Sequence, residues 1–302
     1  MFEQIASNKR RTWLLLGGFG FLIALVAAAV AFLVGFGVWG FGLAVLFAIA
    51  TSWTSYWCSD RLALAASGAR PADGPEFARY HNLVEGLCIA GGIPKPRLYV
   101  IDDDAPNAFA TGRDPHHAAV AVTTGLLAKM NRVELEGVLA HELSHVKNYD
   151  MLVGTIAVTA VGALALLSDI GLRVMLWGGD RDDDSSNNPA AGLIAIAAVV
   201  LIALAPLAAR LMQFAMSRRR EFLADASGVA LTRCPPGLAS ALEKLRDNGT
   251  IVQAGSRAMA QLWIESPLDH PQDQEGNRRS WLNRAFDTHP PIEERIEVLR
   301  AM

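Results

Sequence analysis

The sequence predicts a mainly α-helical membrane protein with about four transmembrane helices and a second, α+β part that carries a small β-sheet. Three observations support this fold class. Residues 12–59 contain no charged side chain. Two further apolar stretches, residues 151–167 and 193–209, are each about as long as the shortest helix that spans a bilayer. The remaining segments are mixed in polarity and contain short runs with the composition of β-strands.

The first apolar stretch, residues 12–59, is long enough for two crossings, because one spanning helix needs about 20 apolar residues. A glycine-rich segment near Gly37 marks the expected turn. A cleaved signal peptide is the alternative, but its apolar region covers only about 7–15 residues. Three basic residues, 9–11, precede the stretch, so the positive-inside rule places the N-terminus in the cytoplasm. We therefore expect an N-terminal transmembrane hairpin over residues 1–59.

The segment that follows, residues 60–150, is expected to form the first part of the α+β domain on the cytoplasmic side. Its hydrophobic periodicity alternates between the helical and the extended type. The patterns predict a helix, two strands and a second helix, in that order, over residues 75–90, 97–101, 118–122 and 132–148.

A second transmembrane hairpin is expected over residues 151–216. Its two apolar stretches flank an acidic loop, and arginines follow the second stretch, so the charge asymmetry places the loop outside and the arginines inside. Two buried helices of a soluble core, joined by a flexible loop, are the alternative. The second part of the α+β domain then covers residues 217–302, with helices near 218–231 and 236–247 and a last helix that begins at Pro290 and Pro291.

Composition narrows the possible functions. The net charge is −3, which gives no electrostatic reason to expect nucleic acid as a partner. Hydrophobic residues make up 52% of the chain and charged residues 19%, which argues against a purely soluble protein. The three cysteines are widely spaced and suggest neither a disulfide framework nor a cysteine-based zinc site. The charge-free run argues against a transporter or channel, because transport pathways place ionisable groups at membrane depth.

The segment from His141 to His145 reads HELSH, and it lies on the helix expected over residues 132–148. Residues four apart share one helix face, so the two imidazoles can bind the same Zn²⁺ ion. Glu142 is then placed to act as a general base toward a water molecule that the metal activates. A surface helix that carries two histidines by chance is the alternative.

A catalytic zinc usually takes three protein ligands, and no third histidine stands near the motif. A carboxylate is therefore expected, and Glu221 is the best candidate. It follows the expected second hairpin, which returns the chain to the membrane face where His141 and His145 lie. Asp225 lies one helical turn further and can accept a hydrogen bond from a ligating histidine. The alternative is that Glu221 is a solvated carboxylate that balances three neighbouring arginines.

The chain resembles the HtpX family of membrane-bound zinc metalloproteases and, more distantly, the CAAX prenyl proteases. The similarity covers nearly the whole chain. Beyond the apolar N-terminal hairpin it includes the segments NAFATG, HELSHVKNYD, RRREFLAD and THPPIEERI, which begin at residues 107, 141, 218 and 288. The resemblance implies a cytoplasmic zincin-like α+β metalloprotease domain, with one zinc held by His141, His145 and Glu221 and with Glu142 as the catalytic base.

Further site residues come mainly from the same resemblance. It implies that His289 donates to the oxyanion, that Arg295 orients it, and that Asn148 lies beside the ligands. Asn107, Ala108 and Phe109 match a substrate-binding edge strand, where an extended peptide can pair through its backbone. The alternative for His289 and Arg295 is that they are a histidine at a helix start and a surface arginine. The alternative for residues 107–109 is that they form an ordinary connecting loop.

The resemblance also implies a biological role. It implies endoproteolytic cleavage of damaged or misfolded membrane proteins in protein quality control, in the inner (plasma) membrane, with the active site facing the cytoplasm. The partners expected are protein substrates and the lipid bilayer. A zinc-stabilised adaptor without catalysis is less consistent with Glu142, and a prenyl protease would carry more spans. Oligomeric state, cleavage-site preference and the role of the acidic loop stay open.

Overall fold

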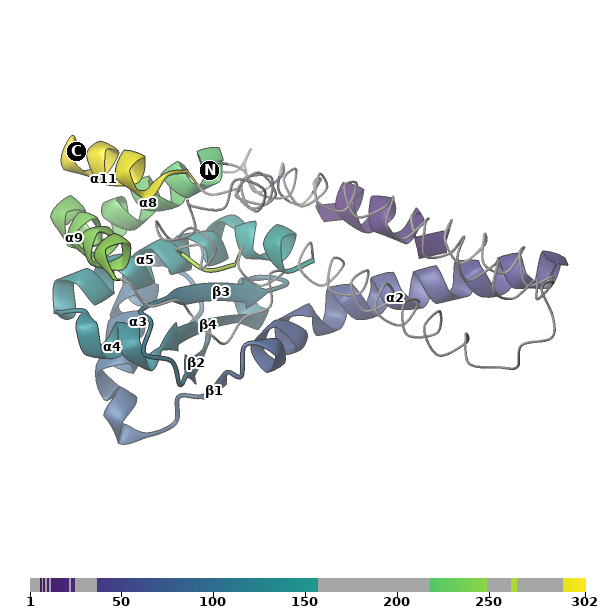
Figure 1. Cartoon of the computed structure of the whole chain (residues 1–302), viewed down its shortest axis with the longest axis horizontal. Helices are drawn as coiled ribbons and strands as arrows, with labels where there is room; N and C mark the ends of the chain where they lie inside the picture. The colour runs from purple at the N-terminus through teal and green to yellow at the C-terminus, as the bar shows by residue number, and fades with distance from the viewer. Residues whose placement is uncertain are drawn as a thin grey trace, which may run out of the picture.

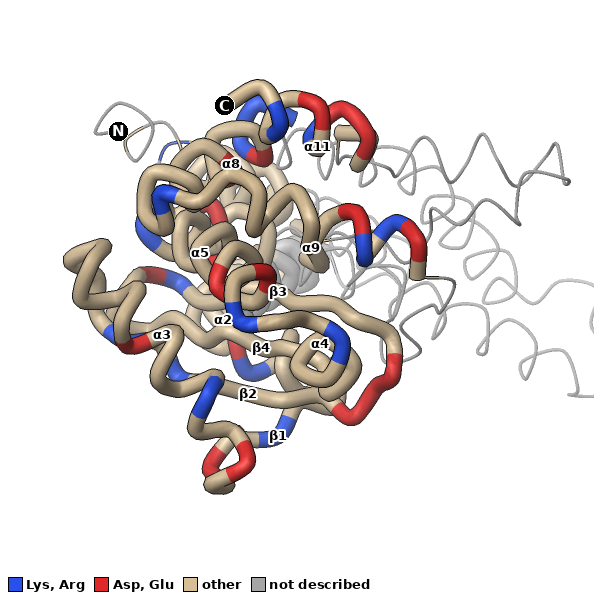
Figure 2. The backbone as a smooth tube through the Cα atoms, turned by 90° about the vertical axis from the view of Figure 1, so that its left-hand side faces the viewer, with Lys and Arg blue, Asp and Glu red and all other residues tan. Residues whose placement is uncertain are grey.

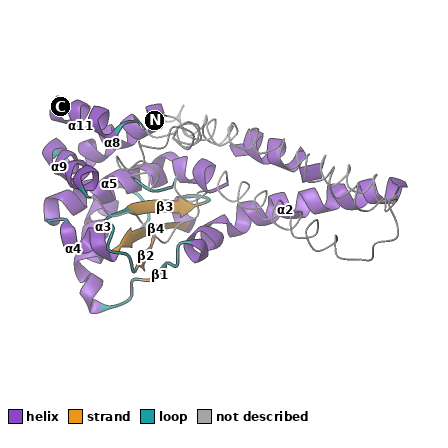
Figure 3. Cartoon of the chain, viewed as in Figure 1, coloured by secondary structure: helices purple, strands orange, loops and turns teal. Residues whose placement is uncertain are grey.

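A computed structural model describes the chain at residues 6, 8, 10, 12–21, 23–24, 37–156, 218–248, 262–264 and 290–302. The expected apolar stretch at 193–209, the acidic loop and His289 lie outside these residues. The predicted fold class is confirmed in its coarse form, since helices predominate and the strands form one small sheet (Figures 1 and 3). Within the described part of the chain, no helix has both the length and the apolarity that a membrane crossing requires.

The helices agree closely with the sequence periodicity. The longest begins at Gly37, where a turn was expected. The labelled helices are α2 (Gly37–Ala66), α3 (Ala78–Gly91), α4 (Thr124–Lys129), α5 (Arg132–Asn148), α8 (Arg218–Thr232), α9 (Pro235–Asp247) and α11 (Ile292–Arg300). Described residues between 6 and 24, which include Asn8 and Thr12, are also helical and form the N-terminal helix, and residues 150–156 are helical after α5. Short 3₁₀ turns at Pro75–Phe77 and Pro115–His117 precede α3 and the last strand.

The sheet has four strands in the order β1-β2-β4-β3. Strands were expected from the sequence pattern over residues 97–101 and 118–122, and a third was expected near residues 107–109 from the resemblance alone, whereas the short strand at Arg70–Pro71 was not predicted. The strands are β1 (Arg70–Pro71), β2 (Arg97–Ile101), β3 (Ala108–Gly112) and β4 (Ala118–Thr123). β2 and β4 are parallel, and the two outer strands are antiparallel to their neighbours. The segment that resembles a substrate-binding strand therefore forms β3 at one edge of the sheet.

The two faces of the sheet bury different side chains, because successive residues of a strand point to opposite faces. Ala108, Val120 and Val122 join the main core, which continues into α3, α5 and α9. Phe109 and Ala121 point the other way and pack against the end of α2. Figure 2 shows no charged residue along β3 and β4, in contrast to the helices and loops around them. The sheet is thus an apolar support on which α5 is fixed.

Candidate metal centre

Helix α5 carries the HELSH motif, and its ends are determined by specific interactions. At its start Asn131 accepts bonds from Val133 and Glu134, while Glu134 bonds back to the amide of Asn131, which forms a capping box. At its end Tyr149 adopts a left-handed conformation with φ of 61°. The intervening helix buries His141 completely and leaves only a small part of His145 exposed. The predicted helix over residues 132–148 is confirmed at both ends.

Helix α8 supplies the carboxylates from one face. Glu221, Asp225 and Gly228 are spaced by four and three residues, so they share the face that packs on α5. A Cβ atom on Gly228 would lie 3.1 Å from the backbone nitrogen of His141, closer than most such contacts. Glycine at this position therefore allows the two backbones to approach closely. The close approach places the carboxylate of Glu221 opposite both histidines.

The three expected ligands converge on one point. The Nε2 atoms of His141 and His145 are 3.2 Å apart, and the carboxylate oxygens of Glu221 lie 3.6 and 3.8 Å from them. Ligands at about 2.0–2.1 Å from a tetrahedral ion are roughly 3.4 Å from one another. The structure therefore confirms the expected zinc site, which is the one such group among the described residues.

The outer nitrogen of His141 is held by Asp225, as the sequence predicted. The distance from Nδ1 of His141 to Oδ1 of Asp225 is 2.8 Å, and both side chains are almost completely buried. Arg295 donates from Nε and Nη2 to the two carboxylate oxygens of Asp225, at 2.9 and 2.7 Å. Burial opposes ionisation, but Arg295 and His141 outweigh it and lower the pKa of Asp225 to about 2. The contact favours an Nδ1–H tautomer for His141, with Nε2 free to bind the metal.

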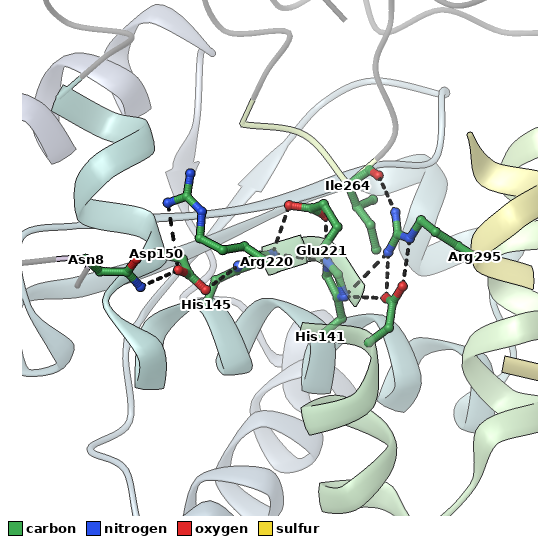
Figure 4. Close-up of polar contacts among 9 residues, drawn as sticks. Asn8, His141, His145, Asp150, Arg220, Glu221, Ile264 and Arg295 are labelled. Atoms are coloured by element: carbon green, nitrogen blue, oxygen red, sulfur yellow. Dashed lines mark hydrogen bonds and ion pairs between the residues drawn. The ribbon is translucent and has the colours of Figure 1, made fainter. Parts of the chain in front are cut away.

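Arg295 is thus an interior residue of the metal centre, as Figure 4 shows. Its Nη1 also donates to the carbonyl of Ile264 at 3.1 Å, so it joins α11 to the segment 262–264. In the described residues the polar contacts of its side chain are with Asp225, Ile264 and, at 3.5 Å, the Nδ1 atom of His141. The sequence alone left open a surface position for Arg295, and this alternative is wrong.

A carboxylate also contacts the outer nitrogen of His145, as Asp225 does for His141, and this partner was not predicted from the sequence. Its Nδ1 lies 3.4 Å from Oδ2 of Asp150, which is the second residue after the end of α5. Oδ1 of Asp150 accepts from Asn8 at 2.6 Å, and Nη1 of Arg220 lies 3.8 Å from it. Asn148, which was expected beside the ligands, contributes its backbone carbonyl as an acceptor for Asn8 at 2.8 Å. The available signal for Asp150 was its place at the end of the segment HELSHVKNYD, which carries the family resemblance.

Glu142 lies on α5 between the two histidines and is buried. Burial raises the pKa of Glu142, while the positive character of His141 and His145 acts in the opposite direction. A carboxylate whose pKa is moved upward toward neutrality is suited to accept and return a proton. The position and the environment of Glu142 therefore match the role of general base.

The outer edge of β3 is partly covered in the structure. The amide of Ile264 donates to the carbonyl of Ala108 at 3.0 Å, and the ring of Trp263 packs edge-on against Phe109 at 4.9 Å. Asn107 precedes the strand, and its carbonyl accepts from the amide of Thr123 at 3.0 Å. The segment 262–264 was not predicted to contact this strand.

The sequence is similar to known peptidases over its whole length. The profile described as "Peptidase family M48" matches residues 75–302. "Protease HtpX homolog" of Streptococcus gordonii is 43% identical over 100% of both chains. That of Dictyoglomus turgidum is 43% identical over 100% of this chain and 94% of its own. Among solved structures, S. mikatae Ste24p matches with 17% identity and a TM-score of 0.49, over 99% of this chain and 67% of that one.

Proposed function

Because the chain belongs to peptidase family M48 and is a zinc metalloprotease of the HtpX type, we propose that it is a membrane-integral endopeptidase that cleaves damaged or misfolded membrane proteins. The observation that carries the chemical part is the convergence of His141, His145 and Glu221, with the buried Glu142 on the same helix as both histidines. The proposal has three further parts. The protein spans the bilayer, its active site faces the cytoplasm, and its substrates are damaged or misfolded membrane proteins.

We assign each side chain one task. Bound zinc would supply a Lewis acid for the scissile carbonyl and for a water molecule. His141, His145 and Glu221 hold the ion, and Glu142 takes a proton from the attacking water and passes it to the leaving amine. His289, which lies outside the described residues, is proposed as a donor to the oxyanion.

Exposed apolar side chains on α2 support a place in the bilayer. Leu43, Leu46 and Ile49 are about 60% exposed and follow one another at helical spacing. Further along the helix Trp53 and Trp57 gather in an aromatic cluster, with their ring centroids 5.7 Å apart. Tryptophan is enriched where a membrane meets water. We propose that this helix lays its apolar side chains against the bilayer, and that the apolar hairpins expected over residues 1–59 and 151–216 anchor the protein in the membrane.

The position of Asn8 supports a cytoplasmic active site. Asn8 directly precedes the basic residues 9–11, which the positive-inside rule places in the cytoplasm. Its side chain is bonded to Asp150, next to the metal ligand His145. The N-terminal end of the chain and the metal centre then lie on the same side of the membrane. The domain division at residues 59, 150 and 216 follows from this topology.

The edge of β3 is our proposed binding strand for the substrate backbone, with Asn107 just before it and Ala108 and Phe109 at its start. Ala108 and Ala110 lie opposite Val122 and Val120, at positions whose peptide groups point away from β4. Ile264 already bonds to the Ala108 carbonyl. An extended peptide would therefore pair next with Ala110 and Gly112.

This pairing predicts an alternating response to substrate methylation. In a peptide substrate, N-methylation of an amide that donates to β3 should raise KM by about 2–10-fold, because one hydrogen bond contributes about 0.5–1.5 kcal/mol. Methylation of the next amide, which points away from β3, should have little effect. Steady-state kinetics on a series of singly methylated peptides measures this. Equal effects at successive positions would contradict strand pairing.

The proposed biological role is tested in proteoliposomes. A membrane protein and a destabilised point variant of it are reconstituted with the enzyme, and cleavage is followed by gel electrophoresis. We expect the destabilised variant to be cleaved several-fold faster, since local unfolding provides the extended segment that an edge strand binds. Equal cleavage of both forms would contradict the quality-control role while leaving the peptidase chemistry intact.

A further inference from the structure

The contacts behind His145 connect the metal centre to the N-terminal end of the chain. We infer that Asp150 is a positioning residue for the zinc ligand His145, and that Asn8 holds Asp150 in the orientation this requires. The N-terminal helix that carries Asn8 is then a part of the metal centre as well as a membrane element. The inference deepens the proposed function and rests on it, because it concerns the same ligands.

The two histidines are supported in the same way from opposite sides. His141 contacts Asp225 through Nδ1, and Arg295 holds that carboxylate with two bonds. His145 contacts Asp150 through Nδ1, and Asn8 takes the other oxygen of this carboxylate (Figure 4). In both cases a carboxylate orients the imidazole, so that Nε2 faces the metal position. The support of His145 is longer, at 3.4 Å against 2.8 Å, so it depends more on what fixes Asp150.

The local backbone brings Asp150 back toward His145. Helix α5 ends at Asn148, and Tyr149 then turns the chain with a positive φ of 61°, which few residues other than glycine adopt. The amide of Tyr149 bonds to the carbonyls of His145 and Val146, which closes the last turn. Asp150 follows this turn and is buried, with its Oδ2 atom directed to His145.

Asn8 holds the carboxylate and the helix end at once. Its Nδ2 donates to Oδ1 of Asp150 at 2.6 Å and to the carbonyl of Asn148 at 2.8 Å. That carbonyl is at the C-terminus of α5, where no amide within the helix can reach it. Asn8 is buried, and the hydroxyl of Thr12, one turn on, donates to its carbonyl. Both amide protons of Asn8 are therefore used, which fixes the direction of the Asp150 carboxylate.

The chemistry explains why a neutral donor suits this position. Oδ1 of Asp150 accepts from Asn8, and Arg220 lies 3.8 Å from the same oxygen. Oδ2 is left for His145. The side-chain amide of Asn8 donates a short, directed hydrogen bond to Oδ1 of Asp150. The amide is neutral, so it adds no charge beside the metal position. If the N-terminal helix moves away, Asp150 loses its shortest bond, at 2.6 Å, and the orientation of His145 is no longer fixed.

The test measures zinc affinity of the detergent-solubilised full chain by competition with a chromophoric chelator. The variants are Asn8→Ala, Asn8→Asp, Asp150→Ala and the double variant Asn8→Ala/Asp150→Ala. We expect Asp150→Ala to weaken zinc binding by about 10–100-fold, as is usual for the carboxylate behind a ligating histidine. Asn8→Ala should weaken it several-fold, and Asn8→Asp more, since the new carboxylate faces Asp150. In the Asp150→Ala background, Asn8→Ala should have little further effect.

Matched controls separate positioning from general destabilisation. Arg10→Ala changes an exposed residue on the same helix, and Asp102→Ala removes an exposed aspartate, so both should bind zinc as the wild type does. Thermal unfolding of the metal-free proteins reports any loss of stability. The inference is overturned if both Asn8 variants bind zinc as the wild type does, or if the Asn8→Ala loss persists undiminished without Asp150. Weak zinc binding by the wild type would instead overturn the proposed metal centre itself.

Discussion

Replacement of Glu142 by glutamine is expected to lower kcat by about 10²–10⁴-fold, the usual contribution of a positioned general base. The amide keeps the size of the side chain but cannot take a proton from water. Zinc content and KM should stay near their wild-type values, because the ligands His141, His145 and Glu221 are unchanged. The measurement is steady-state cleavage of a peptide together with metal analysis of the same sample.

The control for this variant is Glu136→Gln, the same substitution on the same helix, away from the ligands. It should cleave the peptide at the wild-type rate. Undiminished kcat in zinc-loaded Glu142→Gln would show that another group is the base. Loss of zinc from Glu142→Gln would mean that this residue is a ligand instead.

The second large effect is expected for Glu221→Ala. This change removes one of three ligands, so zinc affinity should fall by more than the roughly 10–100-fold that outer partners contribute. Cleavage should disappear with the metal at ordinary zinc concentrations. Competition with a chelator gives the affinity, and excess zinc should restore part of the activity if the fold is intact.

Glu243→Ala is a suitable comparison, because Glu243 is a carboxylate on α9 that pairs with Arg300 at the surface. It should bind zinc as the wild type does. Wild-type zinc affinity in Glu221→Ala would show that α8 does not supply the third ligand.

Local signals in the sequence were sufficient to predict the elements that carry the site. The periodicity over residues 132–148 predicted both ends of α5, and the strand over Arg97–Ile101 was predicted with its observed bounds. Glu221 and Asp225 were expected from helical spacing and from the limited choice of third ligands. These predictions concern residues that are close in sequence, or whose chemistry leaves few alternatives.

Contacts between distant segments were not predictable from the same signals. Asn8 and Asp150 are separated by 142 positions, and no periodicity relates them. The hydrogen bond from the amide of Ile264 to the carbonyl of Ala108 likewise joins two distant segments that no local pattern relates. Arg295 is fully buried because the carboxylate of Asp225 compensates its charge. A buried arginine of this kind depends on a partner carboxylate that only the folded structure brings close. Local sequence patterns do not predict such a contact.

X-ray absorption at the zinc edge of the purified, detergent-solubilised protein tests the central claim most directly. Two imidazoles from α5 and one carboxylate from α8 predict a first shell of nitrogen and oxygen at about 2.0–2.2 Å, with outer scattering from two histidines. A sulfur neighbour at about 2.3 Å, or scattering from fewer than two imidazoles, would contradict the assignment of His141, His145 and Glu221 as the ligands.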